Sequence, residues 1–320
     1  MKNLKNKEKQ MWKIFLKVFI LTILLFCASC GYKTPGVSNF ADIQKLDKST
    51  KWIRGRGLSD EAMLHLGRIK GAEYIDLCGG YLAIPFPNIT DKGFENLAKI
   101  SNELPNLRKI EICTSDLITD KCLYWLSRTQ YVEKVFITNC PKITNQGFEY
   151  LSKNNNIKGI AAVDLERIDN TTLQHLKEMP NLEELDLAGS NFINTESMVL
   201  ISRFEKIHVL LISADKSPNF TDASLKELSK SNTIEHLEIT INENITSDGI
   251  ESLANIKTLK LFFLYNCTTK IVNNDLFAKL YTSLPNCVIM FSEGQDKTLY
   301  RYEPSGDKYI RPDLIPSAED

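Results

Sequence analysis

The sequence predicts an α/β solenoid with one curved parallel sheet on its concave face and short helices on its convex face. Two observations predict it. A pattern with an Ile-Thr-Asp corner returns every 25 to 29 residues between 89 and 253, and an apolar strand pattern precedes each copy. A unit of this size cannot bury its apolar side alone, whereas stacked units share a continuous core. We expect about eight repeats in one domain over residues 51–291, and not several globular domains.

The corner pattern predicts where each short helix begins. Thr and Asp at the corner can bind the free N-H groups of the following helical turn, and apolar residues such as Phe148 and Leu151 follow at helical spacing. The clear copies are ITDKGFENL (89–97), ITDKCLYWL (118–126), ITNQGFEYL (143–151), IDNTTLQHL (168–176), INTESMVLI (193–201), FTDASLKEL (220–228) and ITSDGIESL (245–253).

The strand pattern alternates apolar residues with a period of two, which predicts that one side of each strand is buried. The last repeat is expected to direct Ile256, Leu259 and Leu261 inward. The inward pairs of the earlier strands are Ile75 and Leu77, Ile110 and Ile112, Val135 and Ile137, Ile160 and Ala162, Leu185 and Leu187, Leu210 and Ile212, and Leu237 and Ile239. The residues between them should point onto the concave surface.

Residues 1–29 predict an export signal. A lysine-rich start precedes an apolar run over 18–26, and small residues follow. The run is shorter than the roughly 20 apolar residues that span a bilayer, so cleavage is expected. Ordinary secretory cleavage and a retained anchor remain alternatives to the lipoprotein interpretation that follows.

The segment Ala28-Ser29-Cys30 resembles the lipobox of bacterial lipoproteins, although Cys27 stands where that family usually has an aliphatic residue. The resemblance implies that Cys30 is the first mature residue and carries acyl chains such as palmitate. Gly31 is not the acidic residue that retains some lipoproteins in the inner membrane, so an outer-membrane or cell-surface location is expected, with a periplasm-facing one still possible.

The charge balance of the chain excludes a protein that binds nucleic acid through overall positive charge. The chain has 39 Lys plus Arg against 40 Asp plus Glu. Removing residues 1–29 takes away six lysines and Glu8, which leaves 33 basic against 39 acidic residues and a mature net charge of −6.

The strand and the Ile-Thr-Asp-x-Gly corner resemble leucine-rich repeats, and specifically the cysteine-containing subtype, over residues of about 58 to 290. Cys140 alone matches the cysteine of that subtype, so the resemblance is firmer to the repeat class. It implies a curved solenoid that binds a protein ligand on its concave face. No F-box precedes the repeats, in contrast to many eukaryotic members.

The concave positions supply the candidate binding residues. Apolar residues gather at the centre of the face and are rimmed by acids and lysines, which is a common signature of a protein interface. Cover by the C-terminal tail, or ordinary scattered surface residues without a ligand, are the alternatives. The candidates are Tyr74, Lys109, Glu111, Phe136, Val163, Asp186, Val209, Leu211, His236 and Glu238.

Cys78 and Cys113 occupy one concave column on strands expected to be neighbours. Export permits a disulfide, while buried free cysteines are usual in such repeats, so the pairing stays open. The four histidines are dispersed, and no metal-type cysteine pair lies outside the signal. Without a catalytic motif, we expect neither an enzyme nor a metal or cofactor.

The ends complete the predicted organisation. Residues 30–50 form a tether, an N-terminal cap surrounds Trp52, and residues 292–320 form a polar tail. We expect a monomeric, lipid-anchored extracytoplasmic protein that binds another protein. Resemblance to bacterial adhesins of the repeat class suggests adhesion to a host component. The alternative is a non-catalytic structural or assembly subunit of the bacterial envelope.

Overall fold

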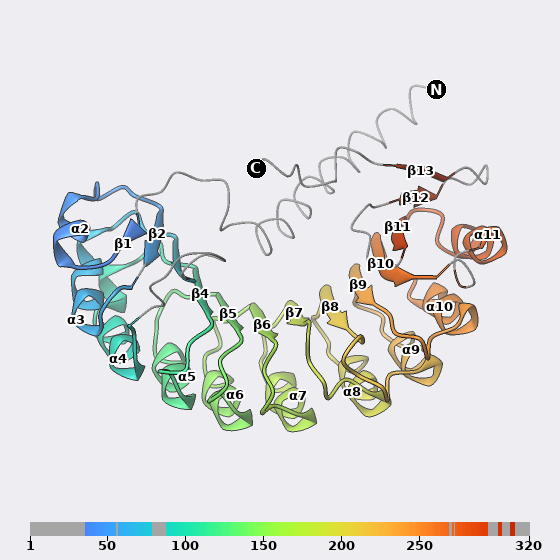
Figure 1. The fold of residues 1–320 in the computed structure, drawn as a ribbon, viewed down its shortest axis with the longest axis horizontal. Coiled ribbons are helices and arrows are strands. Elements are labelled where there is room, and N and C mark those ends of the chain that lie inside the picture. The colour runs from blue at the N-terminus through green and yellow to red at the C-terminus, as the bar shows by residue number, and fades with distance from the viewer. Residues whose placement is uncertain are drawn as a thin grey trace.

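The computed structural model describes residues 36–55, 57–78, 88–268, 271, 273–293, 300–302 and 308–310. In this part of the chain, a 13-stranded sheet follows the chain order from β1 to β13. The strands line the inside of an arc and the helices its outside (Figure 1). Strands β1 to β11 pair in parallel, and β12 and β13 add an antiparallel hairpin. The predicted fold class, a curved α/β solenoid, is confirmed.

Short strands alternate with helices along the solenoid. The strands are β1 (Gly36–Val37), β2 (Trp52–Gly55), β3 (Tyr74–Leu77), β4 (Lys109–Cys113), β5 (Lys134–Thr138), β6 (Gly159–Val163), β7 (Glu184–Leu187), β8 (Val209–Ser213), β9 (His236–Thr240), β10 (Leu261–Cys267), β11 (Val288–Glu293), β12 (Tyr300–Tyr302) and β13 (Lys308–Ile310). The helices are α2 (Phe40–Lys45), α3 (Asp60–Met63), α4 (Asp91–Lys99), α5 (Asp120–Leu126), α6 (Asn145–Leu151), α7 (Asn170–Lys177), α8 (Thr195–Ile201), α9 (Asp222–Leu228), α10 (Ser247–Ser252) and α11 (Asn274–Ser283), with 3-10 turns η1 (Leu64–Arg68), η2 (Ser101–Glu103) and η3 (Leu253–Asn255).

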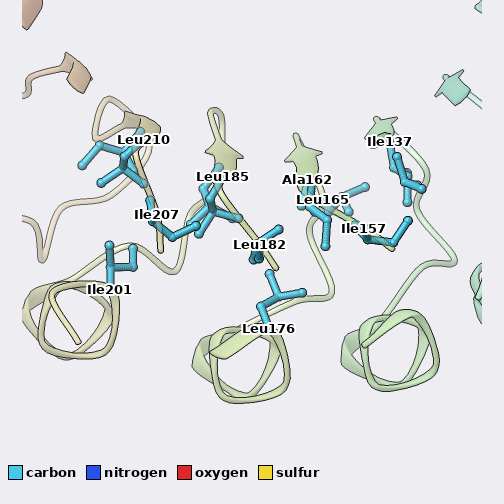
Figure 2. Packing of buried hydrophobic residues seen from close by; sticks show 14 of the residues in the cluster. Ile137, Ile157, Ala162, Leu165, Leu176, Leu182, Leu185, Ile201, Ile207 and Leu210 are labelled. Atoms are coloured by element: carbon cyan, nitrogen blue, oxygen red, sulfur yellow. The ribbon is translucent and has the colours of Figure 1, made fainter. Parts of the chain in front are cut away.

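The core lies between the sheet and the helices and extends from Val37 to Phe291 as one buried cluster. In each repeat the inward strand residues pack on the apolar side of the helix. Figure 2 shows Leu185 and Leu182 above Leu176 of α7. Because neighbouring repeats share these contacts, the stack buries what a single unit could not.

The predicted register of the strand in the last repeat is wrong by three residues. Strand β10 directs Phe262 and Leu264 into the core, while Leu261 faces the other side of the sheet in a small cluster with Phe263 and Met290. Residues 261–264 are all apolar. Because both sides of this strand are apolar, a period of two cannot indicate which side is inward.

The Ile-Thr-Asp corner has a structural role between repeats. The carboxylate of Asp120 accepts hydrogen bonds from the Thr144 amide and hydroxyl of the following repeat, at 2.7 Å each. Thr144 is also the N-cap of α6. The same arrangement joins Asp60 to Thr90, Asp91 to Thr119, and Asp222 to Thr246. These bonds fix each helix to its neighbour.

The third helical position adapts to this arrangement. A Cβ on Gly147 would lie 2.7 Å from Oδ1 of Asp120, so a side chain there would disturb the carboxylate. In two repeats, asparagine takes the place that Asp120 has here. The third residue of the following helix is then threonine or serine instead of glycine. The Thr172 hydroxyl donates to Asn145 and the Ser197 hydroxyl donates to Asn170, each at 2.7 Å.

Regular secondary structure also occurs on both sides of residues 51–291. The predicted tether contains β1 and α2, whose Val37 and Ile43 are buried. The predicted tail contains the hairpin of β12 and β13. The segment 1–29 and Cys30 lie outside the described residues. Within the ranges that are described, no helix has the length and apolarity needed to cross a bilayer.

Candidate functional site: the concave face

Cross-strand register sorts the concave side chains into rows. One row runs from Tyr74 through Lys109, Lys134, Gly159, Glu184, Val209 and His236 to Leu261. A second row runs from Arg54 through Asp76, Glu111, Phe136, Ala161, Asp186, Leu211 and Glu238 to Phe263. The predicted candidates therefore share one face, with Val163 two residues beyond Ala161 on β6.

A buried ion pair lies at the N-terminal end of the second row. Nε of Arg54 lies 3.2 Å from Oδ2 of Asp76, and both side chains are less than a tenth exposed. The Cys78 amide donates to the other Asp76 oxygen at 2.7 Å. Burial raises the pKa of Asp76, and the neighbouring Glu111 charge acts in the same direction, while the Cys78 amide and Arg54 oppose the shift.

Lys109 is held between two aromatic rings on β3 and β5. Its Nζ lies 4.5 Å from the Tyr74 ring centroid and 4.2 Å from that of Phe136, and 3.1 Å from a carboxylate oxygen of Glu111. The Tyr74 hydroxyl donates to the same carboxylate oxygen. Burial lowers the pKa of Lys109, although Glu111 opposes this shift. Cation–π and ionic contacts thus order these side chains.

Cys78 and Cys113 form a disulfide between neighbouring strands, with 4.6 Å between their Cα atoms. Among the described residues, one set of three potential metal ligands comes together, and it consists of these two sulfurs and Glu111. Thiolates are the sulfur form that binds metals. Because the two sulfurs are bonded to each other, this set does not fit a metal ion. The four free cysteines of the described chain are all buried.

The absence of a side chain at Gly159 permits a longer contact in the first row. Lys134 on β5 and Glu184 on β7 lie on strands that are not neighbours, yet their Nζ and Oε2 atoms are 2.6 Å apart. A Cβ on Gly159 would lie 3.2 Å from both Oε2 of Glu184 and Cγ of Lys134. The glycine therefore leaves room for the ion pair to pass over β6.

The C-terminal half of the face contains two acids, Asp186 and Glu238, that pair with no lysine or arginine of the described residues. Asp186 on β7 accepts the Ala188 amide at 2.9 Å. Burial raises the pKa of Asp186 to about 7, with the Ala188 bond opposing the shift and the Glu238 charge adding to it. Glu238 on β9 accepts the Tyr265 hydroxyl at 3.1 Å, and Nε2 of His236 lies 2.8 Å from its other oxygen.

The apolar candidates are less exposed than predicted. Phe136 and Leu211 are 5% and 4% exposed, whereas Val163 and Val209 are half-buried. The sequence pattern indicates which side of a strand faces inward, but does not show how neighbouring long side chains cover one another, as Lys109 covers Phe136. Of these four apolar candidates, only Val163 and Val209 are therefore partly accessible on the concave face.

Several residues of the site were not among the predicted candidates. They are Arg54, Asp76, Lys134, Glu184 and Tyr265. Alternation in the predicted strands was the available signal for Asp76, Lys134 and Glu184, because it places each of them outward. Arg54 precedes the first strand that the pattern predicts. Tyr265 could not be placed in this way while the register of β10 was predicted three residues too early.

Comparisons with known proteins connect this geometry to solved structures. No protein-family model and no curated protein matches the chain. The leucine-rich repeat-containing protein LegL7 of Legionella pneumophila has a similar structure, with a TM-score of 0.55 and 15% identity over 86% of this chain and 92% of that chain. The chain has the leucine-rich repeat fold.

Two further structures of similar fold contain bound partners. A chain of the Rad7 and Elc1 complex of yeast matches with a TM-score of 0.50 and 14% identity over 82% of this chain and 76% of that chain. TLR13, solved with ssRNA13, matches with a TM-score of 0.51 and 13% identity over 82% of this chain but 38% of its own. At these identities the similarity to leucine-rich repeat proteins concerns the fold.

Proposed function

We propose that this chain is a lipid-anchored extracytoplasmic leucine-rich repeat protein that binds another protein through its concave face. The observation that carries the proposal is the order of that face. Ion pairs, cation–π contacts and a disulfide hold its side chains in position across the strands. A surface that is ordered before binding loses less conformational entropy when it binds, which favours recognition.

The disulfide between Cys78 and Cys113 supports an extracytoplasmic location, because disulfides persist in oxidising compartments. The basic and apolar start of the chain and the lipobox-like residues before Cys30 support export and acylation. Several acyl chains on one residue would make anchoring durable, whereas a single chain binds a membrane reversibly. The outer membrane or cell surface is the proposed site.

The nature of the partner rests on the fold and the surface. Rad7 is found in a complex with the protein Elc1, and the half-buried Val163 and Val209 offer apolar contact between charged groups on our chain. Both features favour a protein ligand. Adhesion to a host component is the specific form we propose, from resemblance to bacterial adhesins of this repeat class.

One observation favours a second function, that of a non-catalytic structural or assembly subunit of the envelope. Phe136 and Leu211 are almost fully buried, and the N-terminal half of the face pairs its charges internally. Such a face has less free surface for a soluble ligand. Protease treatment of intact cells separates the two functions, because an adhesin is digested and a periplasm-facing subunit is protected.

Metabolic labelling with palmitate tests the anchor. We expect label in the full chain and none in Cys30→Ser. The control is Cys27→Leu, which supplies the usual aliphatic residue and should keep the label. Label that persists in Cys30→Ser, or its absence from the full chain, would contradict acylation at Cys30.

A further inference from the structure

We propose that Asp186 and Glu238 form an anionic site on the concave face that receives a lysine or arginine side chain of the protein ligand. The inference rests on the proposed function, because it names the chemistry of the partner at the same surface. It concerns the C-terminal half of the face, over β7, β8 and β9.

The register places the two acids on either side of an apolar floor. Asp186 pairs with Leu211, and Leu211 pairs with Glu238. Strands two apart in a sheet are separated by about 10 Å. Asp186 and Glu238 are 7% and 8% exposed, so both carboxylates are largely removed from water.

No lysine or arginine contacts either acid within the described residues. The polar contacts of Asp186 and Glu238 are the Ala188 amide, the Tyr265 hydroxyl and the His236 ring. Three other acids of the face do have such a partner, because Arg54, Lys109 and Lys134 pair with Asp76, Glu111 and Glu184. Two buried carboxylates without a strong cation are costly unless a partner supplies the charge.

His236 provides a second, independent sign of an unfilled site. Its side chain is 4% exposed, and neither ring nitrogen makes a hydrogen bond in the described chain. Nε2 lies 2.8 Å from Oε1 of Glu238, but the two atoms are not aligned for a hydrogen bond. Buried polar atoms without hydrogen bonds destabilise a fold, and a ligand that donates a hydrogen bond to Oε1 would remove the share of this cost that belongs to Glu238.

The geometry suits a basic side chain better than a metal ion. A metal ion requires ligand atoms that lie close together. Among the described residues, the ligand atoms of Asp186, Glu238 and His236 do not all lie within 4.8 Å of one another. A guanidinium group has donors on both sides and can bond two carboxylates that are too far apart to share a metal ion, whereas an ammonium group can bond either one of them. The stem that carries each group is apolar. Leu211, together with Val209 beside it on β8, offers a surface on which that stem can pack.

The surrounding charges predict how binding depends on pH. Asp164 and Glu184 already have the cations Lys216 and Lys134 as partners. Glu238 on β9 also acts on Asp186, and Glu238 is itself in contact with His236 on β9 and Tyr265 on β10. The pKa of Asp186 is raised to about 7. A bound cation favours the ionised acid, so affinity should rise as the pH increases through about 7 and fall below it.

Selection of random heptapeptides displayed on phage tests the inference with a defined probe. The mature protein, immobilised through its C-terminus, is compared with the variant carrying Asp186→Asn and Glu238→Gln. Both substitutions keep shape and remove charge. We expect peptides selected at about pH 8 to be enriched in Lys and Arg, about tenfold less so at about pH 6 and in the double variant.

A second variant separates this inference from the proposed function. Val163→Gln with Val209→Gln makes the exposed apolar part of the face polar and leaves both acids in place. Peptides that bind the unmodified protein but not this variant bind the concave face. If such peptides show no excess of Lys and Arg, or keep that excess when selected on the acid variant, the inference is overturned and concave-face binding is retained. Failure of the unmodified protein to select any peptide would overturn both.

Discussion

Asp120 binds Thr144 of the next repeat through both carboxylate oxygens, at 2.7 Å to the amide nitrogen and 2.7 Å to the hydroxyl. The contact joins α5 to the N-terminus of α6. Hydrogen bonds to a charged group contribute about 1.5 to 3 kcal/mol. The Ile-Thr-Asp corner therefore stabilises the stack as well as each helix.

We expect Asp120→Ala to lower the free energy of unfolding by about 2 to 4 kcal/mol, because two donors of Thr144 lose their acceptor. Urea denaturation followed by circular dichroism measures the change. Asp116→Ala is the matched control, because Asp116 is exposed and makes no hydrogen bond in the described chain. Equal effects of the two substitutions would contradict the role of the corner.

Gly147 should respond to substitution with the opposite sign from an ordinary helical glycine. Alanine in place of glycine within a helix usually stabilises by about 1 kcal/mol. Here the added Cβ would lie 2.7 Å from Oδ1 of Asp120, so we expect Gly147→Ala to destabilise the protein in thermal denaturation.

A double-mutant cycle provides the control for this expectation. Asp120→Asn combined with Gly147→Ser recreates the pair that Asn170 and Ser197 form at 2.7 Å. The combination should be more stable than the sum of the single effects by about 1 to 2 kcal/mol. Additive effects would show that the two positions do not interact.

Thr114 lies directly after β4 with a φ of 50°, a left-handed conformation that is unfavourable for a β-branched residue. The same place in later repeats is taken by Asn139, Asp164 and Gly189, which suit it better. We expect Thr114→Gly to raise the midpoint of thermal unfolding. Thr138→Gly, in the regular strand β5, should lower it, and a lower midpoint for both would exclude relief of strain at Thr114.

Asp186 makes stability depend on pH. Its folded pKa of about 7 exceeds the ordinary value of 3.8, so the native state binds more protons than the unfolded state between these values. Stability from this group is therefore lost as the pH rises from about 4 to about 7. Asp186→Asn should unfold at higher denaturant concentration than the original at about pH 8, with little difference near pH 4. A constant difference across this range would contradict the assignment.

The parts of the fold that depend on local sequence could be predicted. The corner at Thr144 and the alternation of Val135 with Ile137 require only neighbouring residues, and the structure confirms the helix and strand they predict. The register of β10 was not predictable in this way, because its run of apolar residues fits both sides of a sheet. The predicted roles of Cys30 and of the concave residues in binding stay predictions.

Contacts between distant residues could not be predicted. The bond from Cys78 to Cys113 spans 35 residues, and this spacing left the register of their strands open. The ion pair from Lys134 to Glu184 requires Gly159 between them to lack a side chain. Such contacts depend on the stacking of whole repeats, which single-repeat patterns do not describe.

Photo-crosslinking in the living cell tests most directly whether the concave face binds a protein. A crosslinking amino acid in place of Val209 on β8 is compared with one in place of the exposed Lys177 on the outer helix α7. We predict one defined crosslinked protein species from position 209, absent from position 177 and lost when Val163→Gln is added. No crosslink from position 209, or the same species from both positions, would contradict concave-face binding.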